Sequence, residues 1–352
     1  MDDLFFSGYE RADGQIGIRN SILILYTVNC SAFVAQQICR AAPKDIPVQV
    51  IGNGSCFDNQ IIIYRMLRLI AHGNVGAVLI VGHGCEFIQG NLLLNYAEKH
   101  RKPARILMDQ NYGTSRSIEI GLSLLQELWT EIKFLPRKPL PSSRLIIGLT
   151  NGGLPTFSHI LSSCLPQLLS SAQAACCSVL LNLQDFLTAQ SMQTFQSLKS
   201  EEEISHFKAA VLKNIPFAFQ GVLKISQIPD CCGLWLVDPL QDRHAETGIA
   251  ATCPIDQALD LICSGAHLVM LPSNGHFVIG TAIAPALILI PEYISEACME
   301  EIDFTIKEKT SMETLWETLR PVLNGAFTAS ENLGMYDGYL LGSAQTFPEK
   351  IS

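Results

Sequence analysis

The sequence predicts an α/β protein with two Rossmann-like lobes and mostly parallel sheets. Short apolar runs alternate with helical patterns along the chain, which is typical of βαβ units. One run, residues 77–81, is apolar throughout, as in a strand that is buried on both faces. A strand–turn–helix opening at residue 145 resembles the opening at residue 22, so two similar halves are expected.

In the first half, a polar lead-in punctuated by glycines (residues 8–20) precedes a regular alternation of elements. The predicted strands are residues 21–28, 48–51, 77–81 and 105–109. The predicted helices are residues 32–42, 60–72, 91–100 and 118–133. Strands and helices at this spacing build a parallel sheet with helices packed on its faces.

A stretch rich in proline and serine separates the two halves. We predict a first lobe over residues 1–135, a stiff linker over 136–143 and a second lobe over 144–352. Predicted strands of the second lobe are residues 145–149, 234–237, 267–271 and 285–290. Its predicted helices are residues 157–169, 255–263 and 312–323, and the charged run 201–203 is expected to begin a solvated helix.

Composition excludes several classes of function. The chain has 352 residues and a net charge of −9, which argues against binding to nucleic acid. Its acidic N-terminus lacks the basic region of a secretory signal, and its most apolar stretch, residues 278–290, is too short to span a bilayer. Twelve cysteines without a C-x-x-C pair indicate reduced thiols, so a cytoplasmic protein without membrane contact is expected.

Polar residues follow several predicted strands. Gly82-His83-Gly84 ends the strand at 77–81 and is followed by Cys85 and Glu86, while Cys30 and Cys56 follow the two preceding strands. Ligands of open α/β sheets bind at the carboxyl ends of strands, so these side chains are expected in one pocket. A tight turn with a buried cysteine and a helix-capping glutamate is the alternative.

Other cofactor sites are not indicated. Two turns, at Gly52 and Gly82, carry half of a dinucleotide fingerprint, but both lack the third glycine and the acidic residue for a ribose. Neither a Walker lysine nor a G-x-S-x-G elbow is present.

Thiolate and imidazole ligands would suit iron or zinc, whereas carboxylate and water would suit manganese or magnesium.

Three stretches carry a family resemblance: GYERADGQIGIRN at residues 8–20, TVNCSAFVAQQI at 27–38 and NVGAVLIVGHGCE at 74–86. They resemble the altronate dehydratase/galactarate dehydratase family of sugar-acid hydro-lyases. GLTNGGLPTFS, GLWLVDP and GTAIAPALI extend the resemblance, more thinly, into the second half. Because it begins at the dehydratase body, the small N-terminal domain of some members is expected to be absent.

The sequence departs from the family pattern at polar positions. A family His-x-x-Gly-Cys turn is here Gly52-Asn53-Gly54-Ser55-Cys56, without the histidine. A Glu-Cys-Gly-Gly-Ser-Asp turn is here residues 150–155 and keeps only the glycines, and a Gly-Arg-Gly-Ser turn is here residues 273–276. An apolar residue near Ile288 replaces a lysine.

The resemblance implies a site for removing water from a small hydroxy acid. Such a reaction needs a base for the proton next to the carboxylate, an acid for the departing hydroxide, and charge stabilisation from a metal or cations. The resemblance assigns catalytic roles to Cys85 and to Glu86, the latter as ligand, base or orienting group. It also implies a divalent metal, iron or manganese rather than magnesium, bound by Cys56 and Cys85. Its substrate contacts are Arg19, Asn29, Asn151, Gly152, Gly153 and His276.

The sequence leaves two points open. Arg19 could clamp a substrate carboxylate or form a salt bridge within the protein. The acid–base pair is complete only if His83 or His276 replaces the missing histidine and lysine. The sequence therefore predicts a metal-assisted hydro-lyase for a small hydroxy acid; the alternative is a catalytically silent homologue that binds an acid ligand or a partner subunit. Its apolar composition is compatible with a homo-oligomer or a partner subunit.

Overall fold

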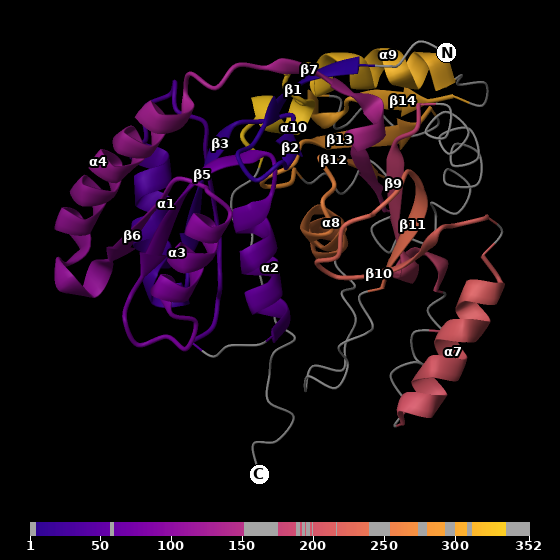
Figure 1. Cartoon of the computed structure of the whole chain (residues 1–352), viewed down its shortest axis with the longest axis horizontal. Coiled ribbons are helices and arrows are strands. Elements are labelled where there is room, and N and C mark those ends of the chain that lie inside the picture. Colours follow the sequence, from indigo (N-terminus) through magenta and orange to yellow (C-terminus); the bar gives the residue numbers. More distant parts are fainter. Residues whose placement is uncertain are drawn as a thin grey trace.

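The computed structural model is an α/β protein with mostly parallel sheets, as predicted (Figure 1). It describes residues 5–56, 60–150, 175–187, 200–215, 217–238, 254–273, 280–292, 300–307 and 312–335, together with residues 191, 194 and 198. The predicted helix at residues 157–169 lies outside these ranges. Within them, no helix is long and apolar enough to cross a membrane.

The first parallel sheet has four strands in the order β4-β3-β5-β6. These are β3 (Ser21–Tyr26), β4 (Val48–Gly52), β5 (Val75–Gly82) and β6 (Ala104–Met108). Helices α1 (Ala32–Ala41) and α4 (Thr114–Ile132) cover one face, and α2 (Gln60–Ala71) and α3 (Gly90–Lys99) cover the other. Every residue of β3 and β5 is buried, which confirms the fully apolar central strand.

The second sheet has seven parallel strands in the order β10-β11-β9-β8-β12-β13-β14. They are β8 (Ile146–Leu149), β9 (Ser178–Asn182), β10 (Gly221–Lys224), β11 (Gly233–Asp238), β12 (Leu268–Pro272), β13 (Ala286–Pro291) and β14 (Phe304–Ile306). The helices described in this half are α7 (Glu201–Lys213), α8 (Pro254–Cys263), α9 (Met312–Leu323) and α10 (Ala329–Asn332). Ser200 and Glu203 form a capping box at the start of α7, where the charged run predicted a helix start.

The two sheets share a common topology. The order β4-β3-β5-β6 recurs within the second sheet as β9-β8-β12-β13. In both halves a helix, α2 or α8, leads directly into the third strand of the repeat, β5 or β12. The repeat that the sequence suggested at residues 22 and 145 is therefore present in the strand order.

A small antiparallel sheet was not predicted. It has the order β2-β1-β7 and consists of β1 (Phe5–Glu10), β2 (Ile16–Gly17) and β7 (Lys138–Pro141). The polar lead-in thus contains two strands, and the stretch predicted as a linker contains β7, which pairs with β1. Prolines fit in β7 because it is an edge strand. The boundary between the two lobes, at residues 136–143, stays a prediction.

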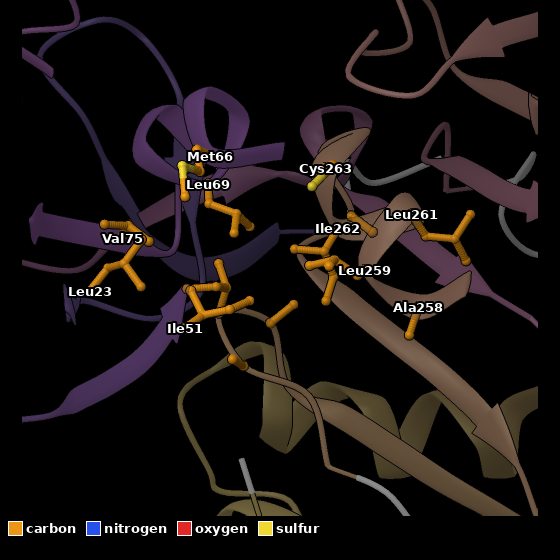
Figure 2. Close-up of a cluster of buried hydrophobic side chains, with 14 of the residues drawn as sticks. Leu23, Ile51, Met66, Leu69, Val75, Ala258, Leu259, Leu261, Ile262 and Cys263 are labelled. Atoms are coloured by element: carbon orange, nitrogen blue, oxygen red, sulfur yellow. The ribbon is translucent and has the colours of Figure 1, made fainter. Parts of the chain in front are cut away.

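Helices α2 and α8 bring the two halves together. Figure 2 shows the apolar cluster between them, in which Met66 and Leu69 of α2 lie near Leu259 and Ile262 of α8. The same helices are joined by a buried ion pair: Arg65 Nη2 lies 2.6 Å from Asp260 Oδ1.

Asn74, which precedes β5, also joins the halves. Its side-chain Nδ2 donates to the backbone carbonyls of His267 (2.9 Å) and Ile283 (3.0 Å). Its side-chain Oδ1 accepts the N–H of Ile18 at 2.8 Å. Asn74 is fully buried, so these three bonds satisfy its polar atoms away from water.

Candidate functional site

Three cysteines follow three neighbouring strands of the first sheet. Cys30, Cys56 and Cys85 come after β3, β4 and β5, which are adjacent and parallel. All three residues are exposed, and Asn29, beside Cys30, is exposed as well. The N–H of Phe87 donates to the carbonyl of Cys56 at 3.3 Å and so joins the loops after β4 and β5. The carboxyl edge of this sheet therefore carries the predicted thiols.

Glu86 lies beneath the loop after β5 with its carboxylate directed inward. Its Oε1 accepts hydrogen bonds from Thr27 Oγ1 (2.8 Å) and the His83 N–H (3.1 Å), and its Oε2 accepts the Gly84 N–H (2.6 Å). The residue is 3% exposed. Burial raises the pKa of Glu86, but the bonds from Gly84, Thr27 and His83 outweigh it and hold the pKa below its usual value.

This geometry favours the orienting role for Glu86 over that of the base, and its catalytic role stays a prediction. A base for dehydration must reach the substrate with a free lone pair and needs a pKa near the working pH. The carboxylate of Glu86 instead closes the turn and fixes the backbone of His83. A Cβ at position 82 would lie 2.7 Å from Glu86 Oε1, so a larger residue there would displace this carboxylate. Of the roles that the sequence left open for Glu86, these contacts fit the orienting one best.

His83 and Asp109 form a pair at the same edge of the sheet. His83 Nδ1 lies 2.6 Å from Asp109 Oδ1, with side chains 32% and 6% exposed. Asp109 directly follows β6, which pairs in parallel with β5. A buried carboxylate at Nδ1 favours the tautomer whose Nε2 carries a lone pair for proton transfer.

Sequence reasoning named His83 as a substitute base but missed Asp109. The available signal was its place at the end of the strand predicted at residues 105–109. Polar residues at the ends of adjacent parallel strands converge. The pair could therefore have been proposed once β6 was placed beside β5.

Arg19 forms the salt bridge that the sequence left as an alternative, so its assignment as a carboxylate clamp is corrected. Its Nε and Nη2 donate to the two carboxylate oxygens of Glu331 at 2.8 and 2.7 Å. Its other hydrogens go to the carbonyls of Ile18, Val322 and Ala326. All five N–H groups of the guanidinium are thus used, and none is left for a substrate.

The remaining predicted contacts, Asn151, Gly152, Gly153 and His276, lie outside the described residues. Within the described ranges, no three His, Cys, Asp or Glu side chains are placed to hold a metal ion. Cys56 and Cys85 supply two thiols, but Glu86 is occupied by the turn. The described donors alone do not fit a complete metal site.

Fold and site together define a class of protein: an α/β protein with a His–Asp pair and exposed thiols at the carboxyl edge of a parallel sheet. Residues 8–133, which contain this whole sheet, match the family described as D-galactarate dehydratase/Altronate hydrolase, second domain. Through this segment the chain is similar to the altronate and galactarate dehydratases.

Curated proteins with these names are also similar to part of the chain. The chain is 28% identical over 174 residues to an altronate dehydratase of Bacillus subtilis, a match that covers 44% of this chain and 33% of that protein. It is 30% identical over 166 residues to an altronate dehydratase of Escherichia coli, covering 43% and 33%. A galactarate dehydratase (L-threo-forming) of Escherichia coli is 23% identical over 183 residues, covering 46% and 35%. The matches thus span about a third of the length of these relatives.

Proposed function

We propose that the chain is a hydro-lyase that removes water from a small hydroxy acid at the carboxyl edge of the first sheet. The observation that carries the proposal is the 2.6 Å pair between His83 and Asp109. It supplies the proton-transfer group that dehydration needs, at the edge where α/β sheets bind ligands. Kinship to altronate and galactarate dehydratases supports a sugar acid as the substrate class.

In this proposal His83 Nε2 takes the proton from the carbon next to the substrate carboxylate. The electron pair released forms a carbon–carbon double bond as the hydroxyl on the neighbouring carbon departs. That hydroxyl accepts the proton from His83 and leaves as water, and the enol rearranges to a 2-keto-3-deoxy acid. Asp109 orients the imidazole and stabilises its charged form, while Glu86 fixes the loop that carries His83.

The divalent metal that the resemblance implies, iron or manganese rather than magnesium, remains part of the proposal. Cys56 and Cys85 would contribute to holding it, and the metal would stabilise the negative charge that develops on the substrate. We assign it no step, because the described residues do not complete its ligand set.

A silent homologue that binds an acid ligand or a partner subunit is the second candidate. One observation favours it: Arg19 and Glu86, two ionic residues assigned to the chemistry, form bonds within the protein instead. A homologue that had lost its reaction would keep such residues for folding alone.

The experiment offers altronate and galactarate to protein purified without oxygen and supplied with iron(II), manganese or magnesium. Formation of a 2-keto-3-deoxy acid supports the hydro-lyase, and no product with any metal supports the silent homologue. His83→Asn is expected to lower turnover by about a hundredfold or more, the usual share of one acid–base group, and Asp109→Asn should also lower it.

A second histidine pair provides the matched control. His100 Nδ1 lies 2.9 Å from Asp13 Oδ2, at the end of α3, with side chains 25% and 12% exposed. His100→Asn therefore removes a similar pair away from the proposed site and should leave turnover unchanged. An equal loss in His83→Asn and His100→Asn would contradict the assignment of the base.

A further inference from the structure

A pocket of about 200 Å³ lies at the amino-terminal edge of the second sheet. Ile146, Ser178 and His267 line it where β8, β9 and β12 begin. The first half contributes the loop at residues 14–16 and the end of α2. This pocket is separate from the carboxyl edge of the first sheet, and its wall comes from both halves of the chain.

Arginines dominate the charge of the pocket. Arg68 and Arg144 line it, and Asp230 is the one acidic side chain among its lining residues in the described part of the chain. The buried histidines in the wall add no positive charge at neutral pH, because burial holds the pKa of His72 well below its usual value and that of His267 at about 4.

Arg68 has donors available for a ligand. Its Nε donates to the carbonyl of Cys263 at 3.2 Å, which anchors the guanidinium to α8. Among the residues that the structure describes, its two Nη groups have no acceptor. A guanidinium held by one edge in this way presents the opposite edge to a planar or tetrahedral anion.

Arg144 fixes another part of the wall. One Nη group donates to Glu10 Oε1 at 3.0 Å and the other to the carbonyl of Gly14 at 2.5 Å, which holds the loop over the pocket. Ser143 also lines the pocket, and Ser178 Oγ donates to the carbonyl of Cys231 at 3.1 Å, which fixes the segment that carries Cys231. The volume is below the roughly 300–1,000 Å³ of drug-sized sites, so a small polar ligand fits best.

We propose that this pocket binds a small anion with a carboxylate or phosphate group, held by the Nη groups of Arg68, with Arg144 as the second cation of the lining. The site is independent of the proposed dehydration, because it lies at a different edge and needs no turnover. Since both halves line it, a bound anion connects them and stabilises the folded protein by mass action.

Two exposed thiols make the proposal testable at the site itself. Cys231 and Cys232 line the pocket, whereas Cys30 and Cys85 are exposed at the carboxyl edge of the first sheet. The full chain is treated with iodoacetamide, and the rate of alkylation of each thiol is measured by mass spectrometry. The probes are sodium phosphate and sodium gluconate, with sorbitol as the neutral match of gluconate and sodium chloride at equal ionic strength.

Phosphate or gluconate at ten times its dissociation constant should slow alkylation of Cys231 and Cys232 roughly tenfold, in proportion to the free fraction. Protection by phosphate alone identifies a phosphate ligand, and protection by gluconate alone identifies a carboxylate. Equal protection by sodium chloride or sorbitol would overturn the proposal. So would protection confined to Cys30 and Cys85, which would place the anion at the first sheet.

A variant tests the role of Arg68. Arg68→Gln should weaken anion binding, followed by the ligand-dependent shift in Tm, by about tenfold or more, the size of one charge-assisted hydrogen bond. Arg116→Gln, in an exposed pair with Glu119 on α4, is the matched control and should bind like the wild type. Unchanged affinity in Arg68→Gln would remove the site; if that variant does not fold, the protection pattern of the wild type decides.

Discussion

Arg19 and Glu331 form a two-point ion pair although 312 positions separate them in the sequence. Glu331 lies in α10, and its carboxylate also accepts the N–H of Thr328 at 2.9 Å as part of a capping box. Arg19 lies between β2 and β3. The pair therefore ties the beginning of the described chain to the end of it.

Arg19→Ala is expected to destabilise the protein strongly. It removes the cation that neutralises the buried carboxylate of Glu331 and one donor from each of three backbone carbonyls, and breaking a buried ion pair costs about 3–5 kcal/mol. Urea unfolding followed by circular dichroism measures the loss. Arg116→Ala breaks an exposed pair of the same type and should cost less than about 1 kcal/mol. Similar losses in the two variants would show that the Arg19 pair is not buried in solution.

Much of the fold could be predicted from local pattern. The apolar run ending at Gly82 and the helical periodicity of α1 to α4 are visible within windows of ten to twenty residues. The strands of the small sheet could not be found in this way. β1 and β7 carry glycine or proline, and they pair with each other although the whole first sheet lies between them in the sequence.

The candidate site was likewise predictable only where local sequence decides it. Placing Cys30, Cys56 and Cys85 on one edge needed only the rule that parallel strands end together. The direction of the Glu86 carboxylate depends on Thr27, and the role of Arg19 depends on Glu331, so both are decided by contacts between distant segments. A sequence shows that such a residue is charged, but it does not show whether the charged group already forms hydrogen bonds or an ion pair within the protein.

Glu86→Gln should lower stability as well as activity. The carboxylate accepts the N–H groups of His83 and Gly84 together with the Thr27 hydroxyl, whereas a glutamine amide has one acceptor oxygen and would direct its NH₂ group at a donor. An unsatisfied buried donor costs about 1–3 kcal/mol. The measurement is the urea midpoint, with Glu119→Gln, in an exposed pair, as the control that should change little. Unchanged stability would mean that the carboxylate is free, and would restore Glu86 as a candidate base.

Finally, the buried histidines between the halves should make stability depend on pH below neutrality. His267 accepts the N–H of Ile146 at 3.0 Å, and burial lowers its pKa from 6.5 to about 4. Between these values the unfolded chain binds a proton at this residue and the folded chain does not, so stability falls as the pH drops from 6.5 to 4, with a share of about 3 kcal/mol from His267 alone. His267→Gln, which cannot titrate, should flatten this decline in urea unfolding between pH 7 and 4.5, whatever its stability at pH 7. His206→Gln, at an exposed position of α7, should leave the slope unchanged. A slope in His267→Gln equal to that of the wild type would show that His267 is protonated in the folded protein at its ordinary pKa.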